Sequence, residues 1–386
     1  SSDEKEKSSS MEEEEDDKEE SKKDSLEQQV RKNIQHSVQN VTSGRQEVEK
    51  LVGDLISVFQ EWLSNSSFPV PQPAIGVDSA FEGWRPCGHD AVYCLLVPLK
   101  PPCGHSFHPE LGTVGDAPEK HRVRVKLQCT CLMDTGAEDM LCLVHQACEA
   151  IERNKSSCLL SYLCTSHYLD AEKTARWFQN LMDLGWRNVP HSRHYSMRML
   201  PSRRSCKLEL TSASGTLFVE VIFGVQQGDS DIFLSSQAPE TIVSPDSMMW
   251  AESYAVAEAK YFSLVARRAL HDSVHLKCLQ LCASTLEGTV LSSYVLKTVG
   301  MHVLNMIPMT SWTRAVLAIQ LQDIICYLRS CLEKKRLDHF IVGNKSLPKD
   351  IILPPAIREA KPFNLFQCLV QDPEAYAKAL CEFEGL

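Results

Sequence analysis

Several features that would assign a class of protein at once are absent from this 386-residue sequence. No run approaches the roughly 18 consecutive apolar residues of a membrane-spanning helix, so we expect no such helix within it. There is no internal repeat. The 16 cysteines are scattered rather than grouped as in a disulfide scaffold, which favours a reducing compartment. What is left is a globular protein of ordinary hydrophobic fraction, long enough for two packed domains.

The net charge of −10 is concentrated in the first 24 residues. That segment holds 12 acidic residues against 5 lysines and carries −7, so the remainder carries only −3. The remainder therefore lacks the global basic excess that favours binding to a phosphate backbone. We expect no nucleic-acid partner.

The composition changes along the chain and indicates four regions. Residues 1–25 are low-complexity Ser, Glu, Asp and Lys with almost nothing to bury, and we predict a disordered acidic tail. Residues 26–64 place apolar side chains at helical spacing, which predicts an amphipathic helix region packed on the domain behind it. Residues 65–245 have a mixed α/β pattern, and residues 246–386 are almost wholly helical.

The local patterns place the elements of these regions. The strands are predicted at 74–77, 91–98, 122–131, 195–200, 205–212, 216–226 and 231–236. The helices are predicted at 138–148, 157–164, 170–186, 249–268, 273–287, 292–306, 313–336 and 373–384. Ala213-Ser214-Gly215 between two of the strands predicts a hairpin, and Asp170 is the expected N-cap of the helix after it.

A sparse set of polar residues resembles a nucleotidyl-transfer site. That chemistry requires two or three carboxylates that converge on Mg²⁺, and a Gly-Ser turn whose backbone N–H groups hold the phosphates. Gly76, Ser79, Glu82 and Asp90, with Glu220 on a later strand, follow the expected order. By itself this pattern is weak evidence.

The helical region strengthens the pattern. Residues 292–343 resemble the C-terminal lobe of cyclic GMP-AMP synthase and of the male-abnormal-21-like family. The matching residues are Ser293, Tyr294, Lys297, Thr298, Cys331, Leu332, Leu337, His339 and Phe340. Within this family the chain is similar to the inositol trisphosphate receptor-interacting proteins, particularly their "like" branch. The segments that carry this similarity are 94–102, 163–178, 205–210, 223–237 and 362–369. The resemblance covers residues 26–384 and implies an α+β, two-lobed nucleotidyltransferase-like fold, with a mixed sheet and helices followed by an all-helical C-terminal lobe.

The resemblance also locates the metal-binding acids of the active enzymes, and this chain departs from them. The first position falls at Gly88, which has no ligand atom, and the second at Asp90, which is retained. The third falls at Glu220, where the active family has Asp, and the extra methylene displaces the carboxylate by about an ångström. The phosphate turn reads Asp78-Ser79, and a carboxylate about 4 Å from a phosphate costs about 4 kcal/mol at an effective dielectric constant near 20.

We therefore predict a pseudoenzyme with no catalytic residue, no metal and no cofactor. The residues themselves also allow a simpler interpretation, in which Glu220 lies at a solvated strand edge and Asp90 caps a turn. The resemblance implies a single-pass membrane protein, attached through a segment before Ser1, with its folded domain in the cytoplasm. It also implies a membrane-protein partner, with the inositol trisphosphate receptor as the family's namesake and calcium signalling as the readout.

Two alternative functions remain open. The first is a metal-dependent nucleotidyltransferase or nucleotide sensor that uses Asp90 and Glu220. The second is a scaffold that binds an inositol phosphate through Arg193, Arg198 and Arg204.

Cysteine and histidine clusters suggest metal sites that we do not favour. His271, His275, Cys278 and Cys282 would span about 16 Å along one helix, too far for a single tetrahedral zinc, so a buried helix face is predicted. Cys129 and Cys131 are too close for a zinc knuckle. A third group lies near the expected cleft and is interpreted as incidental: Cys87, His89, Cys103, His105 and His108.

Overall fold

The computed structural model describes residues 43–86, 90–111, 120–127, 162–237, 246–285 and 290–384. Residues 47–386 form one compact unit and residues 1–46 another, in which residues 43–46 are helical. The predicted acidic tail and the predicted helix 138–148 lie outside the described residues.

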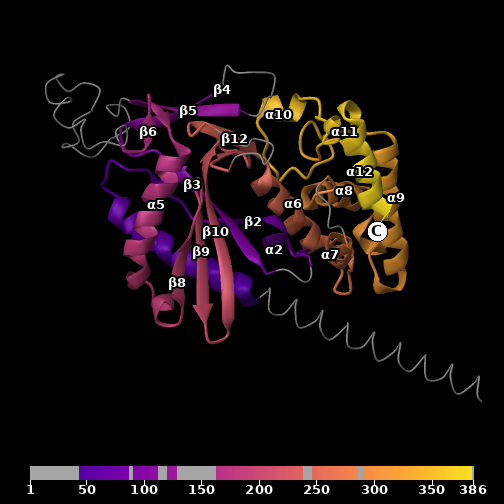
Figure 1. Cartoon of the computed structure of the whole chain (residues 1–386), viewed down its shortest axis with the longest axis horizontal. Coiled ribbons are helices and arrows are strands. Elements are labelled where there is room, and N and C mark those ends of the chain that lie inside the picture. Colours follow the sequence, from indigo (N-terminus) through magenta and orange to yellow (C-terminus); the bar gives the residue numbers. More distant parts are fainter. Residues whose placement is uncertain are drawn as a thin grey trace, which may run out of the picture. The chain divides into compact units, whose positions relative to one another are not determined.

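A mixed sheet organises the first part of the larger unit (Figure 1). Its strands are β1 (Val70–Pro71), β2 (Ile75–Val77), β3 (Val92–Lys100), β4 (His105–Leu111), β5 (Lys120–Leu127), β6 (Cys164–Thr165), β7 (Tyr168–Leu169), β8 (Ser196–Leu200), β9 (Cys206–Ser212), β10 (Gly215–Gln226), β11 (Phe233–Ser235) and β12 (Met249–Ser253). The order is β1-β3-β10-β11-β12-β5-β7-β6, with β2 on β3, β4 on β5, β9 on β10 and β8 on β9. Strands β3 and β10 pair in parallel, and their neighbours pair with them antiparallel.

The strongly apolar strand β3 is buried on both faces, which explains its nearly continuous hydrophobic run. Tyr93, Leu95 and Val97 lie in the main core beneath residues 47–63, which are helical, and α5 (Ala171–Gly185). The intervening Cys94 and Leu96 lie in a second cluster with Val256 of α6 (Ala255–Arg268). Because successive side chains of a strand point to opposite faces, one strand supplies both clusters.

Helix α5 begins at the predicted cap. Asp170 accepts hydrogen bonds from the backbone N–H groups of Glu172 and Lys173, both at 3.0 Å. The helix ends at Gly185, where a Cβ atom would lie 2.5 Å from the ring of Phe59. Glycine at this position therefore lets the helical residues 47–63 approach α5 closely, and the Phe59 and Phe178 rings meet edge to face at 5.5 Å.

The structure confirms the predicted hairpin and corrects two helices. Strands β9 and β10 pair antiparallel around the turn before Gly215. The predicted helix 249–268 is wrong over its first five residues, because Met249–Ser253 form β12 and pair with β11 and β5. The predicted helix 157–164 is wrong at its described end, where Cys164 belongs to β6.

The second part of the unit is helical (Figure 1). Besides α6 it contains α7 (His275–Thr285), α8 (Ser293–Met306), α9 (Leu317–Glu333), α10 (Pro355–Glu359), α11 (Gln367–Gln371) and α12 (Pro373–Glu384). A Cβ atom at Gly300 of α8 would lie 2.2 Å from the Leu279 side chain of α7, so glycine permits this close helix contact.

One described helical stretch, Arg314–Glu333, is long and apolar enough to cross a membrane by length and composition alone. The sequence analysis found no such segment, because polar residues such as Gln320 and Asp323 interrupt the apolar run. Ile324, Leu328 and Leu332 of this helix are buried in the core of the helical part. A core helix satisfies the same length and composition criteria, so this observation is weak evidence for a membrane span.

Candidate functional site

The turn that corresponds to a phosphate-binding loop begins a short helix here. Helix α2 (Asp78–Glu82) follows β2 directly, and Asp78 has a left-handed backbone with φ of 67°. The residue keeps solvent-accessible surface, although many protein atoms surround its carboxyl group. Loss of hydration raises the pKa of its carboxyl group, Lys297 lowers it, and the charges of Glu258 and Glu220 raise it further.

Glu220, the acid at the third expected position, is bound by neighbouring side chains within the protein. Glu220 lies on β10 opposite Cys94 of β3. Its Oε1 atom accepts a hydrogen bond of 2.7 Å from the Ser205 hydroxyl and lies 3.6 Å from Nζ of Lys207. Burial, followed by the charges of Asp78 and Glu220, raises the pKa of Cys94 well above its usual value. This thiol is therefore protonated and donates to Asp78.

Asp90 does not share this environment. It is exposed and precedes the first residue of β3 by two positions. The residue opposite Glu220 is four positions further along, a distance of about 13 Å in an extended chain. Gly88 lies outside the described residues. In the described part of the chain, no group of three or more His, Cys, Asp and Glu side chains is placed to hold a metal ion.

A buried lysine joins two other carboxylates behind Asp78. Nζ of Lys297 on α8 lies 2.5 Å from Oε1 of Glu82 on α2 and 2.7 Å from Oε2 of Glu258 on α6. All three side chains are at most 3% exposed. Glu82 also accepts a hydrogen bond of 2.7 Å from the Trp84 indole. Three elements that are distant in the sequence thus meet at one ammonium group.

The pKa values of the two carboxylates in this cluster are shifted in opposite directions. Burial raises the pKa of Glu82 to about 7, although Lys297 lowers it. Burial would also raise the pKa of Glu258, but Lys297, His339 and hydrogen bonds outweigh it and leave that pKa below its usual value. Burial would lower the pKa of Lys297, and the surrounding carboxylates raise it instead. The ammonium group therefore stays charged and Glu258 is its ionised partner.

An aromatic layer completes the cluster on the helical side. The Tyr294 hydroxyl donates a hydrogen bond of 2.8 Å to Glu258 and lies 2.9 Å from Nε2 of His339. The His339 ring lies 4.3 Å from that of Tyr254 and 4.6 Å from that of Phe363. Burial lowers the pKa of His339 to about 4, so this ring is neutral near pH 7. The arrangement holds charges in place and leaves no exposed nucleophile within it.

Sequence reasoning identified only part of this cluster. Glu82 was noted as one member of an ordered set, Lys297 only as part of a family motif, and Glu258 not at all. A usable signal was present around Lys297, because Val295, Leu296 and Val299 make that helix apolar on several sides. A lysine within such a helix is expected to be buried, and a buried lysine needs a carboxylate.

The basic residues proposed to bind an inositol phosphate are largely engaged elsewhere. Arg204 donates hydrogen bonds to the backbone carbonyl oxygens of Ser236, Asp246 and Met249. Arg198 forms an ion pair with Glu209. Arg204 is therefore engaged by the fold, whereas the Arg198 side chain is 71% exposed and its surface ion pair contributes little to stability. Binding of an inositol phosphate by these residues stays a prediction.

The predicted buried helix face around α7 is confirmed for His275, Cys278 and Cys282 but is wrong for His271, which is exposed and lies in a turn before the helix. His275 is the first residue of α7, and Cys278 and Cys282 are buried in the helical core. Burial raises the pKa values of these thiols to about 12 and about 11, respectively, so both are protonated. Cys87, His89, Cys129 and Cys131 lie outside the described residues.

Comparison with known proteins adds independent support. The family model described as "Mab-21 protein HhH/H2TH-like domain" matches residues 274–350. Together with the mixed sheet and the helices after it, this match confirms the predicted α+β, nucleotidyltransferase-like fold.

Similarity to named relatives extends over both the sheet part and the helical part of this chain. The rat protein named inositol 1,4,5-trisphosphate receptor-interacting protein-like 1 is 34% identical over 94% of this chain and 68% of its own length. The mouse protein of that name gives the same values. The human inositol 1,4,5-trisphosphate receptor-interacting protein is 30% identical over 88% of this chain and 66% of its own length.

Proposed function

The chain belongs to the family of inositol 1,4,5-trisphosphate receptor-interacting proteins, and from that premise we propose that it is a non-catalytic interaction protein on a nucleotidyltransferase-like fold. The observation that carries the proposal is the state of the carboxylates at β3, β10 and α2. Glu220 is held by Ser205 and Lys207, Asp78 occupies the phosphate turn, and Asp90 is displaced along the chain from Glu220. Such a set does not supply the near-octahedral oxygen ligands that Mg²⁺ requires.

The proposed partner is a membrane protein, and the inositol trisphosphate receptor is the first candidate. The names of the relatives state an interaction with that receptor. We extend the interaction to this chain, with calcium signalling as its readout. We further propose attachment to a membrane by a single span outside the present sequence and a cytoplasmic folded domain. Segments of the relatives outside the match leave room for such a span.

Thermal unfolding with Mg²⁺ and ATP, GTP or an inositol phosphate tests the non-catalytic part. A ligand at about 100-fold over its Kd stabilises a folded protein by about 2.7 kcal/mol, which a melting curve resolves easily. We expect no shift for any of these ligands. A shift that Asp90→Asn abolishes would contradict the proposal and favour a nucleotide sensor.

Binding to purified receptor tests the partner separately. The chain, immobilised through a tag, is expected to retain detergent-solubilised inositol trisphosphate receptor. A chain denatured and coupled in the same way is the control. Failure to retain the receptor or any other membrane protein would contradict the partner while leaving the thermal result untouched.

A further inference from the structure

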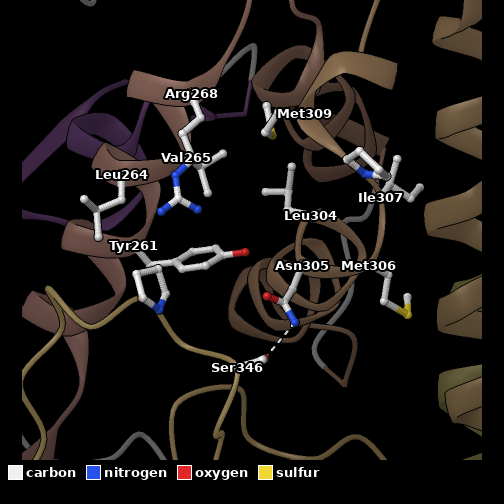
Figure 2. A pocket seen from close by; sticks show the side chains of 12 residues that line it. Tyr261, Leu264, Val265, Arg268, Leu304, Asn305, Met306, Ile307, Met309 and Ser346 are labelled. Carbon is white, nitrogen blue, oxygen red and sulfur yellow. Dashed lines mark hydrogen bonds between the residues drawn. The ribbon is translucent and has the colours of Figure 1, made fainter.

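The helical part contains a pocket whose lining residues are distinct from Asp78, Asp90 and Glu220. It lies between the C-terminal ends of α6 and α8 and is closed by the segment after α8 and by Ser346 and Pro348 (Figure 2). Its volume is about 310 Å³, at the lower end of the range for pockets that bind ligands. None of the carboxylates around Lys297 lines it.

The lining combines apolar side chains with polar ones from Tyr261, Asn305 and Ser346, and Arg268 is its one charged group. Val265, Leu304 and Ile307 contribute apolar walls, and no Asp or Glu is among the lining residues. Figure 2 shows the guanidinium of Arg268 beside the Tyr261 ring, facing Leu304 across the pocket. Within the described residues, Arg268 forms no ion pair with a carboxylate. A planar guanidinium without a protein anion matches a carboxylate of a ligand.

The rim of the pocket favours a large partner. Met306 is 58% exposed and Met309 follows after Ile307-Pro308. Methionine is flexible and polarizable, and such side chains adapt to varied partner surfaces. Pockets for small molecules bury most of their ligand, whereas an occupant beside so exposed a side chain would keep one side open. An anchor residue of a protein segment fits this geometry better than an enclosed small molecule does.

The charge around the lining segments has the same sign as Arg268. Arg267 precedes it on α6, and Lys345 and Lys349 flank the lining residues Ser346 and Pro348. Two acids, Asp272 and Asp350, lie near these residues in the sequence, so the basic residues remain in excess. An acidic segment would therefore be attracted before it docks. We propose that this pocket binds a partner peptide in which a large apolar side chain is adjacent to a carboxylate. The proposal does not depend on the receptor being that partner.

The test uses the full chain and a synthetic peptide with a Leu-Phe pair flanked by Glu residues. Methyl NMR of ¹³C-methionine protein is expected to show shifts of Met306 and Met309, while Met197 and Met249, which lie in the sheet, stay unchanged. Arg268→Gln is expected to weaken peptide binding about tenfold, because it removes a hydrogen bond between charged groups at a partly exposed site. Arg187→Gln is the matched control, since this exposed arginine does not line the pocket or belong to the basic residues around it, and it is expected to bind as well as wild type.

Two further peptides distinguish the contribution of the carboxylate from that of the apolar side chains. Replacing Glu by Gln should weaken binding to wild type but not to Arg268→Gln, and replacing Leu-Phe by Ala-Ala should abolish it in both. Equal affinity of all proteins for all peptides, or no methionine shift at millimolar peptide, would overturn the proposal. Shifts of Met306 and Met309 with octanoate but not with the peptide would assign a small ligand instead. Shifts that depend on protein concentration alone would assign a second copy of the chain.

Discussion

Two sets of carboxylates in this fold differ in their surroundings. Of the two acids where the sequence suggested chemistry, Asp90 is exposed, and Glu220 is mostly buried and bound to Ser205 and Lys207. Glu82 and Glu258 are buried and share one lysine. Asp90 and Glu220 occupy the positions expected of an active site but lack the geometry of metal ligands. Glu82 and Glu258 have shifted pKa values but are not accessible to a substrate. Perturbed pKa values alone therefore do not identify a reactive site here.

Removing Lys297 should give the largest loss of stability, because both buried carboxylates then lack a counter-ion. Lys297→Met leaves Glu82 and Glu258 without their counter-ion, and loss of one partner of a buried ion pair costs about 3–5 kcal/mol. Chemical denaturation should show this loss. Lys207→Met, which removes the half-exposed partner of Glu220, should cost less than about 1 kcal/mol.

A triple variant distinguishes charge from packing. Adding Glu82→Gln and Glu258→Gln to Lys297→Met removes the unpaired charges and should restore part of the lost stability. A triple variant no more stable than Lys297→Met would show that the lysine acts through its packed methylenes.

The pH dependence of stability should next distinguish the buried carboxylates from Asp90 and Glu220. The pKa of Glu82 in the folded protein, about 7, lies above the usual 4.5, so the folded state holds this proton more tightly. The contribution of Glu82 is complete below pH 4.5 and is lost as the pH rises towards 7. Glu82→Gln should therefore gain up to about 3 kcal/mol relative to wild type between about pH 5 and pH 8.

The comparison with wild type is essential because other groups change the stability with pH in the direction opposite to Glu82. The pKa values of His275 and His339 are both lowered to about 4, so their contributions to stability grow with rising pH. Subtracting the two denaturation series cancels them. Glu61→Gln, at an exposed helix position, is the control and should run parallel to wild type. A Glu82→Gln series that also runs parallel would contradict the assigned pKa.

The smallest effect is expected at the position that looks most catalytic. Asp90→Asn changes an exposed side chain and should alter the free energy of unfolding by less than about 0.5 kcal/mol. Differential scanning calorimetry measures this directly. A loss above about 1 kcal/mol would show that Asp90 has a structural partner, because exposed positions away from such features rarely cost so much.

Local signals predicted the parts of the fold that depend on near neighbours. The cap at Asp170 and the hairpin before Gly215 follow from residues within a few positions of each other. Strand β12 was missed because its apolar spacing also suits a helix, and only its pairing with β5 and β11 selects a strand.

The candidate site was less accessible from sequence for the same reason. The resemblance located Asp78, Asp90 and Glu220, but it could not show that Ser205 and Lys207 hold Glu220. The contact between Lys297 and Glu82 joins residues more than 200 positions apart, and no local pattern records such a pair.

The ammonium group of Lys297 also governs how the molecule can move. Separating α2 from α8 would break the buried contact between Glu82 and Lys297, although Glu258 of α6 would still neutralise the ammonium group. Amide protons of α2 should then exchange with solvent mainly through global unfolding rather than through local fluctuations.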